Sequence, residues 1–422
     1  MTDSPTDRAD DAAGDRSVPD WIGSAQAELV RQRLAGWLIH DFRGSNPFAD
    51  RFLNTAALHL SRPVFALIPA DGPPIVLVSV LEAGSLRMPG FEVRAYAGRI
   101  SLDEELRRLL PDGPIAMETS PRGDLPYVSV VDAGTIERLR DLGANVVSSA
   151  DVLQTFASWD EVRVAQHHQA ARTVMEVLED AWTLLQEETA AAREIRESDV
   201  QDRIAEGFDA RGLVYAHRAI VGFGPNAGDP HYAPRRGEDR ALRPGDPILI
   251  DLFARLPQDG APYGDVTWMG VYGPADPAFE HAFERVVAAR EAAVALLRTA
   301  AAEGREVEGR EVDRVVRDLL SEAGFGDAFV HRTGHSLGSV HTHGEAVHFD
   351  DFETRDTRRL RPGIGMTIEP GVYLPAFGVR SELNLVMRAD GPEITTGEQV
   401  DLVRIPIGPH HAHDRDVGRG HG

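Results

Sequence analysis

The sequence predicts an α/β protein with two domains, the second of which repeats its own order of elements. The 422 residues are 42% hydrophobic, so the chain can bury a sizeable core in more than one domain. An α/β pattern runs to about residue 157, and beyond it two helices followed by strands occur twice. We therefore expect a disordered N-terminus (1–20), an α/β domain (21–157), a larger domain (158–408) and a polar, His-rich tail (409–422).

The first domain shows strand and helix signals in alternation. Residues 62–80 predict a strand–turn–strand unit around the Asp-Gly-Pro-Pro run at 71–74. Residues 101–110 and 134–142 predict helices, and residues 144–147 predict a strand. This domain is expected to shape a cleft or a dimer.

The second domain begins with two helices and then repeats the arrangement. Ser158 and Ser198 each begin a capping box, which predicts helices over about 158–188 and 198–212. Strands follow to about residue 272. Pro277 stands at the first position of a third helix, a fourth helix follows it, and strands come next. The repeated order indicates an internal pseudo-repeat.

Two acidic residues lie within apolar runs on either side of a turn. Asp251 and Asp265 stand in these runs, and Asp259-Gly260 between them is a hairpin signal. A hairpin centred near Gln258 places Asp251 opposite Asp265, with Cβ atoms roughly 4.5–5.5 Å apart. Like charges at that distance are destabilising unless a cation lies between them. A bulge would instead turn one aspartate to solvent.

A second pair of strands shows the same pattern. Alternation after Met366 places Thr367 and Glu369 on one face of a strand. In residues 379–385, Arg380, Glu382 and Asn384 share one face, and Leu383 and Leu385 share the other. For either strand alone, an exposed polar sheet face is the favoured interpretation, and the nearby His cluster and Asp-Asp hairpin shift it toward a ligand face.

A histidine cluster lies between the two acidic pairs. His331, His335, His341 and His343 occur in a short glycine-rich segment. His335 stands beside Gly334, where backbone and metal can approach closely. A solvated, His-rich loop is the alternative.

Together these residues predict a carboxylate-rich, two-metal hydrolytic site. Four carboxylates and one imidazole aimed at one place would repel each other without cations. The sequence contains no cysteine, so oxygen and nitrogen atoms must hold any metal, which suits Mn, Co, Fe or Zn. The predicted ligands are Asp251, Asp265, His335, Glu369 and Glu382.

These residues resemble the pita-bread metallopeptidases, which include Xaa-Pro aminopeptidases, proline dipeptidases and methionine aminopeptidases. The family pattern of two Asp, Gly-His, a Thr-Ile-Glu-Pro-Gly run and a last Glu is matched here by Asp251, Asp265, Gly334-His335, residues 367–371 and Glu382. Segments at 117–121, 126–129 and 131–135 resemble the creatinase-type domain of the Xaa-Pro branch. The resemblance covers about residues 20–408. It departs from the pattern in a longer Asp–Asp interval and in irregular spacing after His335.

The resemblance implies a creatinase-like N-terminal domain, a pita-bread catalytic domain and cleavage of the bond between an N-terminal residue and proline. It implies two divalent ions, with Mn as the first expectation and Co, Zn or Fe as the others, and a homodimer. Glu369 is expected to relay a proton, while His231 and His341 contact the substrate, with His343 as the alternate to His341. Arg380 is expected to bind a carboxylate or to anchor Glu382. Supporting roles fall to Thr267 and Asn384.

Three other functions stay open. The same cage could serve non-peptide chemistry, such as a lyase or an amidine hydrolase, or the chain could be a non-catalytic binding protein. The segment from Gly334 to Gly338 also fits G-x-S-x-G, the nucleophile elbow of serine hydrolases, with Ser336 as nucleophile. The histidines that could complete such a triad lie in the polar tail: His410, His411 and His413.

Composition limits the partners. The net charge of −23 argues against nucleic-acid binding, which needs basic patches. No apolar run approaches the length of a membrane span. The first twenty residues do not resemble a signal peptide. We therefore expect a cytoplasmic protein, and the resemblance to the pita-bread metallopeptidases implies a peptide substrate with proline at its second position.

Overall fold

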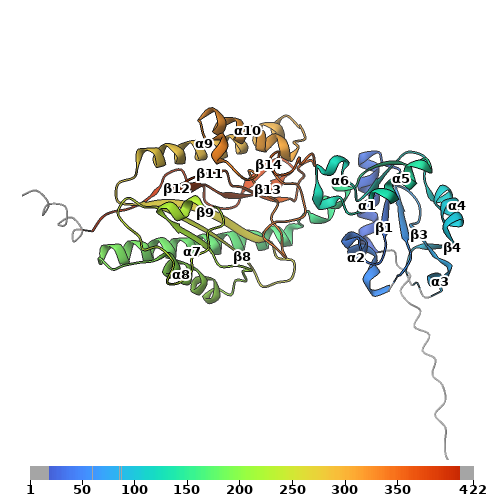
Figure 1. Ribbon diagram of the computed structural model, residues 1–422, viewed down its shortest axis with the longest axis horizontal. Helices are drawn as coiled ribbons and strands as arrows, with labels where there is room; N and C mark the ends of the chain where they lie inside the picture. Colours follow the sequence, from blue (N-terminus) through green and yellow to red (C-terminus); the bar gives the residue numbers. More distant parts are fainter. Residues whose placement is uncertain (1–18, 59, 85, 87, 409–422) are drawn as a thin grey trace, which may run out of the picture. The chain divides into compact units, whose positions relative to one another are not determined.

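The computed structural model describes residues 19–408, except positions 59, 85 and 87. The chain divides into two compact units, Met1–Phe156 and Ala157–Gly422 (Figure 1). Most of the predicted disordered N-terminus and the whole predicted tail lie outside the described residues.

The first unit is built on a six-stranded sheet with the order β4-β3-β2-β1-β5-β6. Its strands are β1 Gly36–Asp41, β2 Val64–Pro69, β3 Ile75–Ser79, β4 Glu92–Tyr96, β5 Pro114–Met117 and β6 Asn145–Ser148. Its α-helices are α1 Asp20–Gln32, α2 Pro47–Leu53, α3 Val80–Ala83, α4 Arg99–Leu109, α5 Ala133–Asp141 and α6 Ala150–Leu153. The predicted strand–turn–strand unit is the antiparallel pair β2–β3, and the helices predicted near 101–110 and 134–142 are α4 and α5.

Both faces of this sheet are covered. On β1, Trp37 and Ile39 pack into one apolar cluster, whereas Leu38 between them packs into another on the opposite face. Because successive side chains of a strand point to opposite faces, a continuous apolar run is what a sheet buried on both faces requires.

The second unit places helices on both sides of its strands (Figure 1). Its helices are α7 Glu161–Ala190, α8 Glu197–Ala210, α9 Pro277–Ala302 and α10 Gly309–Glu322. Its strands are β7 Ile220–Phe223, β8 Pro247–Arg255, β9 Tyr263–Tyr272, β10 Gly365–Ile368, β11 Gly371–Leu374, β12 Phe377–Arg380, β13 Leu383–Arg388, β14 Gly391–Ile394 and β15 Val403–Ile405. The strands form sheets of order β15-β9-β8-β7, β10-β13-β14 and β11-β12. Among the described residues, no helix combines the length and the apolar character that crossing a membrane requires.

The alternation along β8 decides where the polar site lies. Ile248, Ile250 and Leu252 pack with residues of α7 and α8 in one core cluster. Asp251 and Phe253 have the opposite parity and line a pocket. The helices therefore bury one face of β8, and the chemistry-bearing face turns away from them.

Two of the predicted helix starts are wrong by about two residues. The cap of α7 is Asp160, whose carboxylate accepts a hydrogen bond from the Arg163 amide at 2.8 Å, rather than Ser158. The helix α8 begins before Ser198, because the Asp199 carboxylate accepts a hydrogen bond from the Arg196 amide at 3.0 Å. A carboxylate so placed also complements the positive end of the helix dipole.

The hairpin of β8 and β9 forms, but its predicted register is wrong. Asp251 pairs with Thr267, and Asp265 pairs with Phe253. The hairpin is centred on Asp259, one residue later than predicted, and a shift of the centre by one residue moves every partner by two. Because side chains alternate with a period of two, the two aspartates keep the same face as diagonal neighbours.

Candidate metal centre

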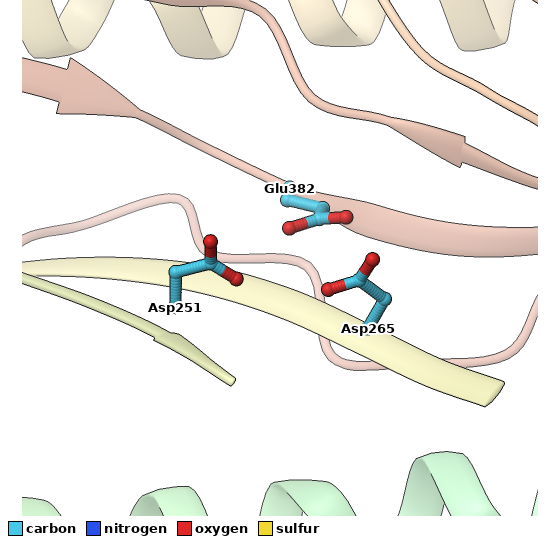
Figure 2. Close-up of side chains that lie close together, drawn as sticks. All are labelled: Asp251, Asp265 and Glu382. Carbon is cyan, nitrogen blue, oxygen red and sulfur yellow. The ribbon is translucent and has the colours of Figure 1, made fainter. Parts of the chain in front are cut away.

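Three carboxylates converge from three strands or strand ends. Oxygen atoms of Asp251 on β8, Asp265 on β9 and Glu382 between β12 and β13 all lie within 4.8 Å of one another. Figure 2 shows the three carboxylate groups turned toward a common point. All three residues are buried, so water screens their mutual repulsion poorly.

His335 completes one side of this cluster from an extended segment beside β10. The Thr367 amide donates to the His335 carbonyl at 2.9 Å, and the His335 amide donates to the Thr367 hydroxyl at 3.0 Å. A Cβ atom on Gly334 would lie 2.2 Å from the Thr367 carbonyl oxygen, so only glycine allows this approach. The glycine before His335 is thus explained by backbone packing.

The imidazole of His335 is oriented as a ligand would be. Its Nδ1 lies 2.9 Å from the Ser336 carbonyl, which requires Nδ1 to carry the proton and leaves the Nε2 lone pair free. That Nε2 atom lies 3.2 Å from Glu369 Oε1 and 3.7 Å from Asp265 Oδ2. Burial lowers the pKa of His335 to about 3, so the ring is neutral at physiological pH.

Burial and mutual repulsion act on the carboxylates in the opposite direction. Burial raises the pKa of Asp265 well above its usual range, and the nearby Asp251 and Glu369 add to the effect. Burial likewise raises the pKa of Glu382 well above its usual range, with Asp265 as the next cause. Such groups are stable as carboxylates only when positive charge lies among them.

The donor set fits divalent metal ions. Asp251 Oδ1 and Glu382 Oε1 are buried and have no hydrogen-bond partner within the described chain. The free lone pair of His335 Nε2 faces carboxylate oxygens, which are acceptors too. Oxygen and nitrogen ligands without thiolates suit Mn, Co, Fe and Zn, and a cation would satisfy all these lone pairs together. The predicted ligands that the structure brings together are Asp251, Asp265, His335, Glu369 and Glu382.

Arg380 binds one carboxylate of the cluster, but it does not anchor Glu382 directly, which was one of the two expectations. Its guanidinium pairs with Asp251 Oδ2, and its Nε donates to the Thr267 hydroxyl at 2.9 Å. That hydroxyl in turn donates to Glu382 at 2.9 Å. Arg380 therefore reaches Glu382 only through Thr267.

Asn384 also takes a supporting position. The Asp265 amide donates to the Asn384 side-chain oxygen at 2.9 Å, and the Asn384 side-chain nitrogen donates back to the Asp265 carbonyl. These two bonds fasten β13 to β9 at the point where Asp265 enters the cluster.

Tyr373 and His331 belong to the same network, although the sequence assigned them no role. Arg380 donates to the Tyr373 hydroxyl at 3.0 Å, and that hydroxyl lies 2.8 Å from His331 Nε2. His331 Nδ1 lies 2.7 Å from the Arg332 carbonyl, so Nε2 is the acceptor and Tyr373 donates to it. The sequence signal that could have identified Tyr373 is its spacing of four residues from Glu369, because alternation places both side chains on the same side of an extended segment.

The carboxylates form the floor of a cavity of about 780 Å³. Every sequence-predicted ligand and substrate-contacting residue lines it, and so do several that sequence reasoning missed, including Ile220 and Phe253. The predicted lining residues are His231, Asp251, Asp265, His335, His341, His343, Glu369, Arg380 and Glu382. A volume of this size admits a short peptide.

Between the two candidate histidines of the loop, the geometry favours the alternate, His343. Its ring centroid lies 4.0 Å from that of His335. His341 also lines the cavity, but it makes no ring contact with the ligand set. Both histidines are exposed and the loop that contains them has irregular spacing, so the choice between them stays a proposal.

The segment around Ser336 does not form the nucleophile elbow that a serine hydrolase requires. Ser336 lies on the extended segment that pairs with Met366 of β10, and no helix follows it over residues 337–350. The Ser336 hydroxyl is buried, and no hydrogen bond from a described histidine reaches it. A nucleophile elbow needs a strand before the serine and a helix after it.

The fold and the site together define a carboxylate-rich metal centre at the base of a peptide-sized cavity, as in metal-dependent hydrolases. Residues 165–389 match the model of metallopeptidase family M24. This match covers more than half of the chain, and the chain therefore belongs to metallopeptidase family M24.

Curated relatives agree with this assignment. The chain is 33% identical over 218 residues to the probable dipeptidase PepE of Mycobacterium tuberculosis, covering 50% of this chain and 52% of that protein. It is 34% identical over 200 residues to the Xaa-Pro dipeptidase of Lactobacillus helveticus, covering 47% of this chain and 50% of that protein. The matched region spans about half the length of each relative.

Solved structures show the same fold over nearly the whole chain. The dipeptidase PepE of Mycobacterium ulcerans matches with a TM-score of 0.61 and 25% identity, covering 93% of this chain and 100% of that one. The X-prolyl aminopeptidase of Caenorhabditis elegans, described as having a di-nuclear active site, matches with a TM-score of 0.57 and 14% identity, covering 91% of this chain and 63% of that one. The predicted pita-bread fold with a preceding N-terminal domain is confirmed, and so is the resemblance to the Xaa-Pro dipeptidase branch.

Proposed function

We propose that the chain is a metal-dependent peptidase that hydrolyses the bond between an N-terminal residue and proline. The observation that carries the proposal is the ligand set at the cavity floor: two orphaned carboxylate oxygens, of Asp251 and Glu382, and a free imidazole lone pair, of His335, lie beside a space that admits a peptide. Family membership, the Xaa-Pro dipeptidase relative and the di-nuclear relative support the finer points.

The five ligands would hold two divalent ions. When bound, such ions lower the pKa of a water molecule and polarise a peptide carbonyl. Glu369 lies at the cavity with a side chain that is 17% exposed, so it can take the proton of the attacking water and pass it to the leaving nitrogen. His231 and His343 stand on the cavity wall, where they can hold the peptide and stabilise developing charge.

The first test is release of the N-terminal residue from Ala-Pro and Ala-Pro-Ala. The metal-free protein and protein loaded with Mn, Co or Zn are compared under the same conditions. Metal-dependent release supports the peptidase, and the ratio of the two rates separates a dipeptidase from an aminopeptidase. Bound metal without turnover would move the assignment to non-peptide chemistry, and neither metal nor turnover would leave a binding protein.

Variants separate the ligands from the substrate contacts. Asp251→Ala is expected to lose metal and rate together, because it removes a ligand. His343→Ala is expected to keep the metal and to lose about 10²-fold or more in kcat/KM. His341→Ala is the matched control, with a smaller loss expected. If His341→Ala proves the more damaging of the two, the assignment of His343 is wrong.

Manganese as the resident metal, the homodimer and the cytoplasmic compartment stay predictions. The oxygen and nitrogen ligand set is compatible with Mn, but equally with Co, Fe and Zn. Metal analysis of protein purified without added metal checks the first point. Sedimentation of the full chain checks the second.

A further inference from the structure

A buried carboxylate outside the cavity has no role in the proposed chemistry. Glu197 is the first residue of α8, and its exposed fraction is 0%. It forms no ion pair with any arginine in the described part of the chain. A buried carboxylate without a cation is costly unless hydrogen bonds satisfy it, and the positive end of a helix favours it there.

Four groups donate five hydrogen bonds to this carboxylate. The Phe223 amide donates at 2.7 Å and the Arg240 amide at 2.8 Å. The Asn226 side-chain nitrogen lies 3.0 and 3.1 Å from the two oxygens. The Tyr232 hydroxyl donates at 2.7 Å. All four donors belong to one stretch of chain, and the two backbone amides mark its ends.

That stretch, residues 223–240, contains His231. Tyr232 is its immediate neighbour, and Pro230 on its other side accepts a hydrogen bond from Arg380 at 3.3 Å. The 3₁₀ turn Gly224–Gly228 at its start is packed tightly against β12, where a Cβ atom on Gly378 would lie 1.8 Å from the Ala227 carbonyl oxygen. His231 is therefore held between a clamp at Glu197 and the arginine that pairs with Asp251.

We propose that Glu197 is a positioning residue that holds the 223–240 segment and thereby sets the place of His231 on the cavity wall. The proposal rests on the proposed substrate contact of His231. Glu197 itself lies outside the cavity lining, so its effect on the reaction passes through the segment it holds.

Glu197→Gln is the test variant, because an amide nitrogen would face donors where an acceptor is needed. Its matched control is Glu206→Gln, the same change on an exposed position of the same helix. With metal content equal, Glu197→Gln is expected to lower kcat/KM for Ala-Pro by about tenfold or more, and Glu206→Gln by less than about twofold.

A double-variant cycle separates positioning from general damage. In a His231→Ala background, Glu197→Gln is expected to change kcat/KM by less than about twofold, because the group it positions is gone. If the two losses multiply instead, Glu197 does not act through His231 and the proposal is wrong. If His231→Ala retains the full rate, the proposed contact of His231 fails instead.

Hydrogen–deuterium exchange tests the clamp without any turnover. Peptides that cover residues 224–240 are expected to exchange about tenfold faster or more in Glu197→Gln than in the parent protein, while peptides from β8 and β9 are unchanged. Unchanged protection of 224–240 would overturn the proposal even for a protein that cleaves no peptide.

Discussion

The two aspartates of the hairpin look equivalent in the sequence but differ in their partners. Asp251 pairs with the buried Arg380, whereas Asp265 contacts no arginine in the described part of the chain. Asp265 instead faces Asp251, Glu369 and Glu382, which burial and repulsion make costly to ionise. In the metal-free protein, loss of the Asp265 carboxylate should therefore raise the free energy of unfolding, whereas loss of the Asp251 carboxylate should lower it.

Asp265→Asn is expected to stabilise the metal-free protein by about 1–3 kcal/mol and to abolish metal binding, because it removes a carboxyl group whose ionisation burial and the neighbouring carboxylates oppose. Asp251→Asn is expected to destabilise it by about 3 kcal/mol, because it leaves Arg380 buried without its anion. Denaturant unfolding after chelation gives both values, with metal analysis of the same samples. Destabilisation by both changes would contradict this account of the cluster.

Glu118 in the first unit predicts a pH dependence. Its carboxylate is fully buried, Asn46 donates to it at 2.9 Å, and Trp37 Nε1 donates to its other oxygen. Burial raises the pKa of Glu118 from 4.5 to about 7. Because the folded state holds the proton more tightly than the unfolded state, this group's stabilising contribution is present below about pH 4.5 and is lost as the pH rises through about 7.

The first unit is therefore expected to lose about 3 kcal/mol from this group between pH 4.5 and pH 8. Burial lowers the pKa of His40, which gives a contribution of opposite sign. The difference between the parent protein and Glu118→Gln isolates Glu118, since the amide does not titrate. Exchange protection of β1 and β5 at several pH values measures it, and a variant with the same pH profile as the parent would refute the prediction.

At the scale of elements, the local sequence pattern predicted the helices and strands well, but it predicted the pairing of the strands poorly. The apolar runs around Asp251 and Asp265 are β8 and β9, because a short continuous apolar run is itself the signal of a buried strand. The register of the hairpin depends on its loop. A shift of the hairpin centre by one residue makes Phe253, rather than Asp251, the pairing partner of Asp265.

The strand predicted through Glu382 is in fact two strands. β12 pairs with β11, β13 pairs with β10, and the chain changes sheets at Ser381 and Glu382. The alternation of side chains continues across the break, so no local signal marks it. Glu197 and Tyr373 were missed for the same reason, since their contacts are distant in sequence, and the choice between His341 and His343 stays a prediction.

The close contact between β12 and the turn before His231 predicts a sensitive glycine. Gly378→Ala is expected to lower the stability of the second unit by about 2 kcal/mol or more, because its Cβ atom would lie 1.8 Å from the Ala227 carbonyl oxygen and the backbone must shift. Gly304→Ala is the control: it lies in open space with a φ of +64°, so only the conformational cost of about 1 kcal/mol applies. Equal losses of melting temperature would show that the packing relaxes freely.

At the scale of the whole molecule, the ligands come from both halves of the pseudo-repeat. Asp251 and Asp265 follow α7 and α8, whereas His335, Glu369 and Glu382 follow α9 and α10. Each helix pair packs in its own core cluster, and the cluster of α9 and α10 also includes Leu249 of β8 and Met269 of β9. Metal binding should therefore increase exchange protection across the second unit and leave the protection of the first unit's sheet unchanged.

Chelation is expected to raise the exchange rates of β8, β9 and β13 while β1 and β2 keep theirs. Metal at a hundredfold excess over its Kd stabilises the folded state by about 2.7 kcal/mol, which corresponds to about a hundredfold in protection. Exchange measured with and without a chelator, followed by addition of Mn to restore protection, provides the test. A uniform change over both units, or none in β8 and β9, would argue against ligands in these strands.

The position of the ligands gives bound ions a second consequence. Asp251 and Glu382 belong to opposite halves of the second unit, so an ion held by both acts as a removable cross-link that closes the long stretch of chain between them. Such closure takes its effect from the entropy of the unfolded chain and grows only slowly with the length enclosed. A chain cut at the connection 273–276 would then consist of two fragments held together by the β15–β9 pairing and by shared core packing, and metal coordination would add a further link between them.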